Sequence, residues 1–215
     1  MNTISRIIKK EFSWEMTRIA LERNDVQYQI GDVVTSELRN SYMQWVITDL
    51  GSDYIRFEAR NCITNRDLKM NRERTNAGGI ASSLMQEYLN NDIWKLLPDD
   101  LQDVISTVNR KYMDGNEEKT YQTKLFLPSA SEVFNEDNCF GEKNLYKQLD
   151  YYKNCLHRIK RGGFLGRSTH WWLSSPLFDG TTCFCSVTPA GAANYDVADN
   201  YLGLGVAPCF MITKS

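Results

Sequence analysis

The stretch HWWLSSPLFDGTTCFCSV, residues 170–187, decides the fold class of this chain. It contains two segments typical of strands, HWWLSS and TCFCSV, because aromatic and β-branched residues favour strands and the residues between them favour a turn. Pro176 should end the first strand, since proline cannot donate a ladder hydrogen bond. A third strand, GVAPCFMI, follows a turn-rich segment. We therefore expect a sheet in the C-terminal third.

Side chains alternate between the two faces of a strand. Cys183 and Cys185 should therefore share a face, where two thiols more often pack as small hydrophobic groups than perform chemistry. Trp171 and Trp172 should point to opposite faces. We predict that one of them is buried and that the other lies sideways or outward, where it can serve a binding surface.

Upstream of these strands, hairpins alternate with short helices. YMQWVITDL and DYIRFEAR flank Gly51-Ser52, and VNRKYMDGNEEKTYQTKLFLP contains an Asp-Gly turn, so each predicts a hairpin. Ser83 with Gln86, and Ser129 with Glu132, have the spacing of capping boxes and predict helix starts. This order of helices and strands predicts an α+β domain with a mixed or antiparallel sheet.

Two longer helices are also predicted. Residues 3–23 have an amphipathic pattern, which should pack on the chain itself or against a partner. Its apolar face comprises Ile4, Ile7, Ile8, Met16, Ile19 and Ala20. Residues 145–159 carry apolar side chains at spacings of three and four, and Gly162-Gly163 should end that helix. Arg158, Lys160 and Arg161 would then lie at its C-terminus, where the helix dipole favours cations.

The composition indicates a globular protein whose net charge is too small to create a strong electrostatic field. The chain has 215 residues, 42% of them hydrophobic, and a net charge of −2, so neither nucleic acid nor an anionic membrane is an expected partner. No apolar run reaches the ~18 residues of a membrane span, and the N-terminus lacks the apolar core of a signal peptide. We therefore expect a cytoplasmic protein, with an N-terminal helix in residues 1–29 and an α+β domain in residues 30–215.

The cysteine and histidine content argues against a disulfide framework and a zinc site. The six cysteines are widely spread, no C-x-x-C occurs, and only two histidines are present. Asp196, Asp199 and Asn200 could offer oxygens to calcium, but three ligands are about half of what that ion requires. We predict no metal and no cofactor.

Several segments together resemble one bacterial family. WWLSSP, FCSV, the glycine of AGAAN and the terminal GLGVAPCFMI resemble the signature of the domain-of-unknown-function family 6273, W-W-L-x-S-P, F-x-x-V, G and G-V-x-P. WVITDLGSDYIRFEAR, SSLMQEYLNN and TKLFLPSASEVF resemble its earlier segments. The resemblance runs from about residue 30 to residue 212. Ser174 and Ala207 replace arginines found in other members, which puts anion binding by those two positions in doubt.

The family has no settled activity, so the resemblance implies a fold more than a function. Its pattern is similar to that of C-type-lectin-like domains, in which a mixed α/β core supports a loop-rich binding face. The resemblance thus implies a single C-type-lectin-like domain with flanking helices. It also implies a phage or mobile-element origin, such as a component of a phage particle. The N-terminal helix would then serve attachment or homo-oligomerisation.

The segment TPAGAANYDVADNYLGLG, residues 188–205, is the candidate binding face. Its tyrosines supply rigid contact area, and its asparagines and small residues supply adaptable hydrogen bonds. We predict a non-enzymatic recognition module for a glycan or protein ligand. The expected contact residues are Trp172, Tyr195, Asp196, Asp199, Asn200 and Tyr201. The alternatives are a cysteine-dependent enzyme distantly related to formylglycine-generating enzymes, with a reactive thiol near His170, and a purely structural subunit.

Overall fold

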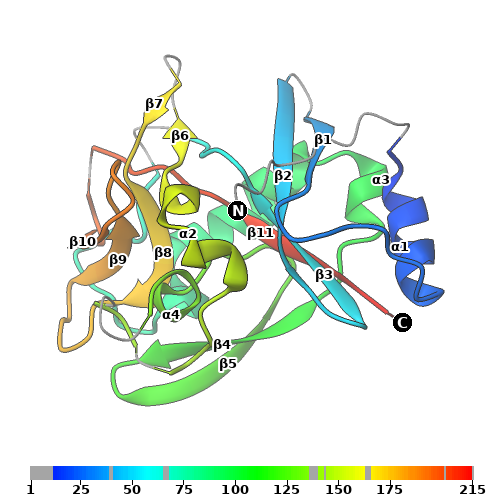
Figure 1. Cartoon of the computed structure of the whole chain (residues 1–215). Coiled ribbons are helices and arrows are strands. Elements are labelled where there is room, and N and C mark those ends of the chain that lie inside the picture. The colour runs from blue at the N-terminus through cyan, green and yellow to red at the C-terminus, as the bar shows by residue number, and fades with distance from the viewer. Residues whose placement is uncertain are drawn as a thin grey trace.

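The computed structural model describes residues 12–38, 41–64, 68–135, 140–142, 144–162, 166–200 and 202–214. In these residues the strands form two antiparallel sheets, ordered β1-β2-β3-β11 and β10-β9-β8, and two hairpins (Figure 1). The first sheet consists of β1 (Val33–Leu38), β2 (Ser41–Leu50), β3 (Tyr54–Ala59) and β11 (Cys209–Thr213). The second consists of β8 (Trp171–Pro176), β9 (Cys183–Val187) and β10 (Ala193–Val197). The hairpins are β4 (Val108–Asp114) with β5 (Glu117–Thr123), and β6 (Arg161–Gly162) with β7 (Arg167–Ser168).

The helices are short. They are α1 (Trp14–Glu22), α2 (Leu84–Tyr88), α3 (Asp99–Gln102) and α4 (Ala130–Val133). α2 runs on into a π-helical turn, Leu89–Ile93, and a 3-10 turn, Trp94–Leu96. The predicted α+β class with antiparallel sheets is confirmed. Within the described ranges, no helix has the length and apolar character that crossing a membrane requires.

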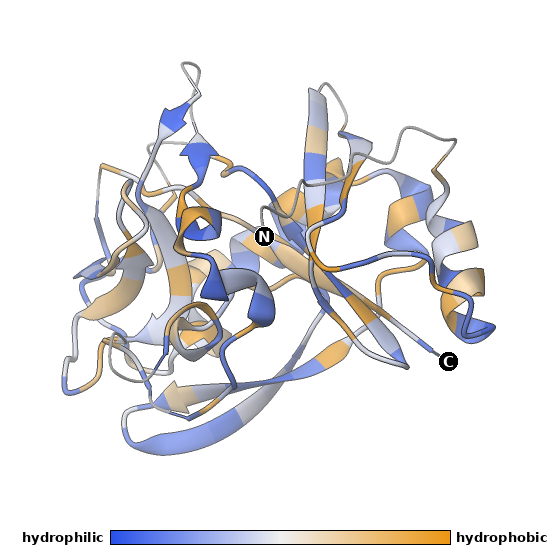
Figure 2. Cartoon of the chain, in the orientation of Figure 1, coloured by the Kyte–Doolittle hydropathy of each residue, from blue (hydrophilic) through white to orange (hydrophobic). Residues whose placement is uncertain are grey.

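Local sequence signals explain several of these elements. The strands β2 and β3 pair across the predicted Gly51-Ser52 turn, and β4 and β5 pair across Gly115, whose φ of 59° suits glycine. Much of the β4–β5 hairpin is hydrophilic, along the lower edge of Figure 2. Ser83 caps α2 by accepting the Gln86 backbone N–H. The capping box predicted at Ser129 and Glu132 is confirmed in full.

The C-terminal segment joins the two sheets. Gly205 donates its N–H to the His170 carbonyl at 2.7 Å and accepts the Trp172 N–H at 2.9 Å, so it pairs with β8 of the second sheet. A few residues later the chain enters β11, which pairs with β3 of the first sheet. A Cβ atom at Gly205 would lie only 2.6 Å from the Cβ atom of Cys62. Glycine therefore permits the close approach at this crossing.

One face of the first sheet carries an aromatic core. The rings of Phe57 on β3 and Phe210 on β11 stack at 5.1 Å. Trp45 meets Phe210 edge to face at 4.9 Å, and Trp14 of α1 meets Phe57 at 5.3 Å. All four side chains are buried. Burial of such large rings supplies much of the hydrophobic stabilisation of this half of the molecule.

The helix α1 packs against this half of the molecule with a face different from the predicted one. Ser13 caps α1, and the buried residues are Trp14, Thr17 and Leu21, at spacings of three and four. Met16, which the prediction placed on the apolar face, is 59% exposed. α1 contacts α3 and β11. Residues 1–11, which include the predicted Ile4, Ile7 and Ile8, lie outside the described residues.

The opposite face of β3 carries buried charges. Alternation alone would place Arg56 and Glu58 toward solvent if that face were open, yet their exposures are 2% and 0%. Glu58 accepts a hydrogen bond from the Tyr152 hydroxyl and pairs with Lys160 at 2.8 Å. Lys160 also donates to the Ala59 carbonyl at 2.8 Å. Burial opposes the charge of Lys160, but the Glu58 carboxylate outweighs it and holds the pKa of Lys160 above its ordinary value.

A second buried group centres on Glu132 of α4. Its carboxylate accepts hydrogen bonds from Arg56, from Arg110 at 2.7 Å and from the Ser129 backbone N–H at 2.8 Å. Burial opposes ionisation of Glu132, but Arg110 and Arg56 more than offset it and lower its pKa to about 2. We call Arg56, Glu58, Arg110, Glu132 and Lys160 the charged core.

The helix predicted over residues 145–159 is absent, and that prediction is wrong. The chain instead forms two 3-10 turns, Asp150–Lys153 and Cys155–Arg158. The apolar stripe does not persist, since Leu156 is 66% exposed. Lys160 does not cap a helix either, because the buried Glu58 carboxylate draws it into the interior. A contact with Glu58, about a hundred residues away in the sequence, thus replaces the helix-capping role that the local pattern predicts for Lys160.

Substituting Glu132 tests the charged core through its pH dependence. A carboxyl group whose pKa is lower in the folded chain stabilises the fold above its unfolded pKa, and this stabilisation is lost as the pH falls through the folded value. For Glu132 this stabilisation is lost between pH 4.5 and about pH 2. We expect Glu132→Gln to lower the free energy of unfolding by ~3–5 kcal/mol at pH 6. The difference from wild type should shrink steadily as the pH is lowered toward 3.

Urea unfolding at several pH values measures this difference. The matched control is Glu118→Gln, which breaks a Lys111 pair whose side chains are about half exposed. It should cost under ~1 kcal/mol at every pH. A Glu132→Gln effect as small as that of the control, or one independent of pH, would contradict the role assigned to Glu132.

Candidate functional site

The second sheet contains both strands predicted from residues 170–187 and one that was not predicted. β8 and β9 pair in antiparallel fashion, with an irregularity between Trp172 and Pro176. The segment 188–205, expected to be a loop, contains β10, which pairs with β9 in antiparallel fashion. β10 is an edge strand of this sheet, and its residues are half-buried or exposed. Within residues 188–205, β10 is therefore a partly exposed edge of the sheet.

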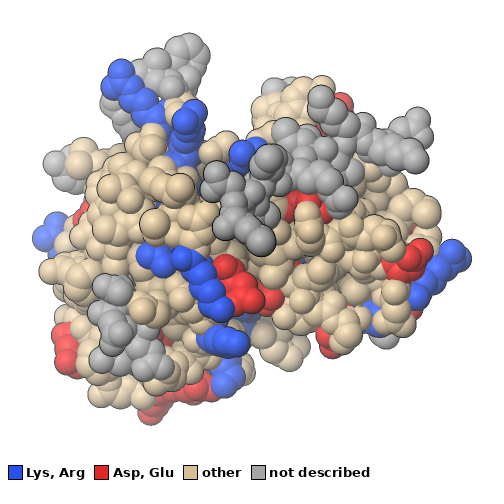
Figure 3. Space-filling model, viewed as in Figure 1, with Lys and Arg blue, Asp and Glu red and all other residues tan. Residues whose placement is uncertain are grey.

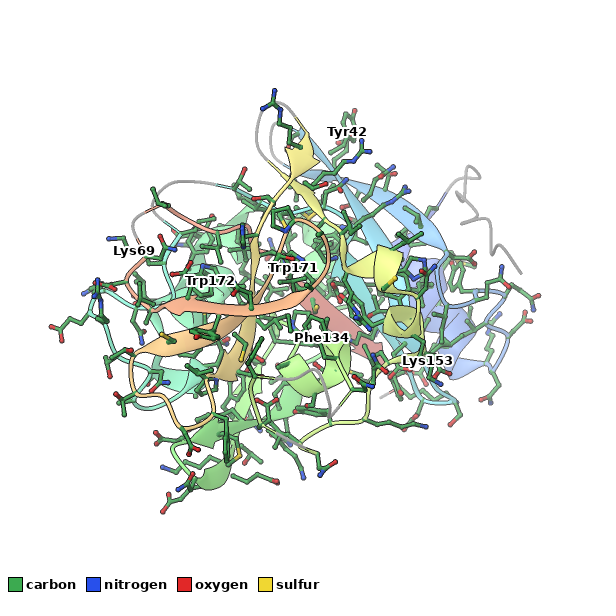
Figure 4. All side chains as sticks on the ribbon, turned by 60° about the vertical axis from the view of Figure 1, so that its left-hand side comes forward. Tyr42, Lys69, Phe134, Lys153, Trp171 and Trp172 are labelled. Atoms are coloured by element: carbon green, nitrogen blue, oxygen red, sulfur yellow. The ribbon has the colours of Figure 1, made fainter. Side chains whose placement is uncertain are left out.

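The prediction that only one of the paired tryptophans is buried is wrong. Trp171 and Trp172 are both 0% exposed, and both lie in the interior in Figure 4, whereas Tyr42 and Lys69 lie at its periphery. The indole of Trp171 donates to the Arg158 carbonyl at 2.9 Å, and that of Trp172 donates to the Leu68 carbonyl at 3.3 Å. Both faces of β8 are covered, so the Trp172 side chain does not reach the surface as the predicted contact role requires.

The other predicted contact residues occupy different environments. Tyr195 is 45% exposed. Asp196 accepts the Val197 N–H, and Asp199 pairs with Arg74 at 3.1 Å. Asn200 is buried, and its side-chain oxygen accepts the Leu202 N–H at 2.8 Å, so it shapes the local turn. Tyr201 lies outside the described residues. Of the described predicted residues, Tyr195 has the largest free surface.

Tyr195 belongs to an exposed aromatic group. Its ring meets that of Phe140 edge to face, with centroids 5.5 Å apart. Phe178 is tied to the same place, because its N–H donates to the Phe140 carbonyl at 2.9 Å. Phe140 and Phe178 are 45% and 56% exposed. We call Phe140, Phe178 and Tyr195 the aromatic surface.

Close packing holds Phe140 in this position. A Cβ atom at the next residue, Gly141, would lie 2.8 Å from the Cβ atom of Ser175 and 2.9 Å from that of Ala130. Glycine therefore lets the chain lie directly on β8 and α4. The hydroxyl of Ser175 in turn accepts the Ala130 N–H at 2.7 Å. These contacts fix the aromatic surface to the body of the protein.

A groove of about 290 Å³ adjoins Phe178. Met113, Leu177 and Phe178 give it apolar walls, while Asn116 and Asp179 provide polar groups. The turn beside it is held by Asn76, whose side-chain amide donates to the carbonyls of Gly180 and Cys183 at 2.8 and 2.9 Å. Glu142 also lines the groove, and its burial raises the pKa of its carboxyl group. An apolar concavity with a few polar groups is typical of ligand sites.

Burial disfavours nucleophilic chemistry at three of the described cysteines, Cys62, Cys185 and Cys209. Burial raises the pKa of Cys62 to about 12 and that of Cys209 well above its ordinary value, which disfavours the reactive thiolate. Cys185 is buried and donates to the Pro176 carbonyl, whereas Cys155 is exposed. Cys139 lies outside the described residues. Among the side chains that the structure describes, no cluster of three His, Cys, Asp or Glu residues is placed to hold a metal ion.

The sequence alone did not single out Phe140 and Phe178. Each lies beside a turn, in CFGE and LFDG, and the only signal was a large aromatic side chain in a polar, glycine-containing context. Their neighbour Tyr195 is more than fifteen residues from Phe178 in the sequence, and tertiary contacts bring the three together.

Comparison with known proteins places the chain in a family without a described activity. The family model matches residues 49–214, which include both sheets apart from β1 and most of β2. No curated protein and no solved structure gives a significant match. The chain belongs to the family described as a domain of unknown function, DUF6273.

Proposed function

We propose that this protein is a non-enzymatic recognition module that binds a carbohydrate through the aromatic surface and the groove beside it. The observation that carries the proposal is the exposed edge-to-face pair of Phe140 and Tyr195, with Phe178 next to it. Solvent-exposed aromatic rings gathered in one place are unusual unless they serve binding. The C–H faces of sugar rings pack well on such side chains.

The polar groups favour a carbohydrate over nucleic acid. Asp179 and Asn116 line the groove together with Glu142, and its described lining includes no lysine or arginine. Carboxylate and amide oxygens accept hydrogen bonds from sugar hydroxyl groups, whereas they repel a phosphate backbone. The face shown in Figure 3 likewise carries acidic and basic side chains interspersed rather than one broad basic area.

The same proposal includes a relationship to C-type-lectin-like domains. Its support is architectural: β11 returns to pair with β3, and the second sheet carries the exposed edge. α1 buries Trp14, Thr17 and Leu21 within this chain, so an attachment or oligomerisation role would fall to other parts of the N-terminal region.

A glycan array tests the binding proposal with wild type, Phe178→Ala/Tyr195→Ala and the control Tyr42→Ala. Tyr42 is 72% exposed on β2, away from the aromatic surface. We expect wild type and the control to bind the same glycans. The double variant should bind about tenfold more weakly or worse, because it loses two stacking side chains. Equal signals from the double variant and wild type would exclude the aromatic surface, and binding confined to a parallel peptide array would exclude the carbohydrate.

Thiol reactivity separates this proposal from a cysteine-dependent enzyme. In a Cys139→Ser background, we expect Cys155 to react rapidly with a disulfide reagent in the native state. Cys185 and Cys209 are buried and should react only on unfolding, and the half-buried Cys62 and Cys183 should react slowly. Adding Cys155→Ser should remove the fast phase. A fast thiol that survives both substitutions would instead support the enzyme.

A further inference from the structure

A second cleft is lined in part by residues 146–150, which follow Phe140 in the chain. Its volume is about 440 Å³, which is within the range of small-molecule sites. β3 and β11 form one wall, and Tyr146 to Asp150 form another. The base contains the side chains of Arg56, Arg110 and Glu132. The described lining of this cleft shares no residue with that of the groove beside Phe178.

The base of this cleft has an excess of positive charge. Arg56 and Arg110 both pair with the single carboxylate of Glu132. The three side chains together therefore carry one net positive charge. Glu132 already accepts bonds from both guanidinium groups and from a backbone N–H. Arg56 is 2% exposed, and its Nε atom has no hydrogen-bond partner among the described residues. A buried donor without a partner is costly, so a side-chain movement that opened this atom to an acceptor from a ligand in the cleft would be favoured.

The second guanidinium group is held rigidly. Arg110 lies between two rings, 4.4 Å from the centroid of Phe126 and 4.2 Å from that of Tyr146. The Tyr146 hydroxyl is fixed by the Lys111 backbone N–H, which donates to it at 2.5 Å. A guanidinium plane fixed in this way is preorganised to bind a planar acceptor such as a carboxylate.

The charged side chains at the rim of the cleft favour a ligand with a single negative charge. Lys147 adds a positive group, but Asp49 and Asp150 add two negative ones. Asp49 accepts the Tyr54 hydroxyl at 2.8 Å, and Asp150 pairs with Lys153 at 2.6 Å, so both acids are fixed near the opening. The positive and negative side chains of the lining are equal in number. The acidic residues at the rim would repel a doubly charged phosphate. A single carboxylate with a neutral or cationic remainder fits better.

We propose that this cleft binds the carboxylate of an N-acyl amino acid or of a peptide C-terminus. The guanidinium groups of Arg110 and Arg56 would donate hydrogen bonds to that carboxylate, and Lys147 would attract it at the opening. This ligand is distinct from the carbohydrate assigned to the aromatic surface.

Calorimetric titration of the full chain with N-acetylphenylalanine tests the proposal. The comparison ligands are its uncharged amide, a short peptide ending in a free phenylalanine carboxylate, and inorganic phosphate. We expect the acid and the peptide to bind and the amide and phosphate not to. Tighter binding of the peptide than of the single acid identifies a peptide terminus as the source, and the reverse identifies a free acid.

Three substitutions locate the binding site. Arg110→Lys keeps a positive charge near Glu132 but removes the planar fork, and should weaken acid binding about tenfold or more. Lys147→Ala changes an exposed side chain outside the charged core, so the fold is retained and binding of the acid should weaken several-fold. Lys95→Ala, an exposed lysine away from the cleft, should leave binding unchanged.

The proposal is overturned if acid and amide bind equally, if neither the acid nor the peptide binds at millimolar concentration, or if phosphate binds more tightly than the acid. If Arg110→Lys does not fold, the Lys147→Ala variant and the pair of acid and amide decide the result. A Phe178→Ala/Tyr195→Ala chain should bind the acid normally, which separates this outcome from that of the carbohydrate proposal.

Discussion

Pairing of buried charges on one face of β3 is the constraint on which the rest of the structure depends. Glu58 pairs with Lys160, which precedes β6, and Arg56 pairs with Glu132 of α4. Arg110 of β4 completes the second group. A buried charge without its partner is strongly unfavourable, so each pair fixes a distant segment onto β3. Apolar packing on the opposite face supplies bulk stabilisation, but it is much less specific about which segment lies where.

The charged core also positions both candidate binding regions. Glu132 belongs to the capping box of α4, and the neighbouring Ala130 N–H donates to Ser175 of β8. Ser131 of the same helix bonds to Glu142 and accepts the Tyr146 N–H at 3.2 Å. The chain after α4 thus includes both Phe140 of the aromatic surface and Tyr146 of the arginine cleft. A short helix fixed by one carboxylate therefore orients the aromatic surface and the arginine cleft together.

The parts of the fold set by local chemistry could be predicted from the sequence. Turn residues and alternation identified the two hairpins, and Ser83 and Ser129 identified two helix starts. The remaining features depend on contacts between distant residues. An Arg-x-Glu alternation such as that of Arg56 and Glu58 is typical of a half-exposed strand, and nothing nearby indicates that Lys160 will cover it. Trp172 is buried, and its indole N–H donates to the carbonyl of Leu68, about a hundred residues away in the sequence.

The candidate site, too, could be predicted only where it depends on local sequence and not where it depends on distant contacts. The sequence identified the segment 188–205 and Tyr195, because its composition is typical of binding loops. It did not identify β10, which forms only because β9 offers a pairing edge, or the residues Phe140 and Phe178, which tertiary contacts bring beside Tyr195.

A double-mutant cycle on Glu58 and Lys160 tests the central claim most directly, with urea unfolding of Glu58→Leu, Lys160→Met and the double variant. Each single variant leaves one buried charge unpaired, whereas the double variant leaves neither. We predict that the double variant loses at least ~2 kcal/mol less stability than the sum of the two single losses. Losses that add to within ~0.5 kcal/mol would show that the pair does not act as a unit and would contradict the account.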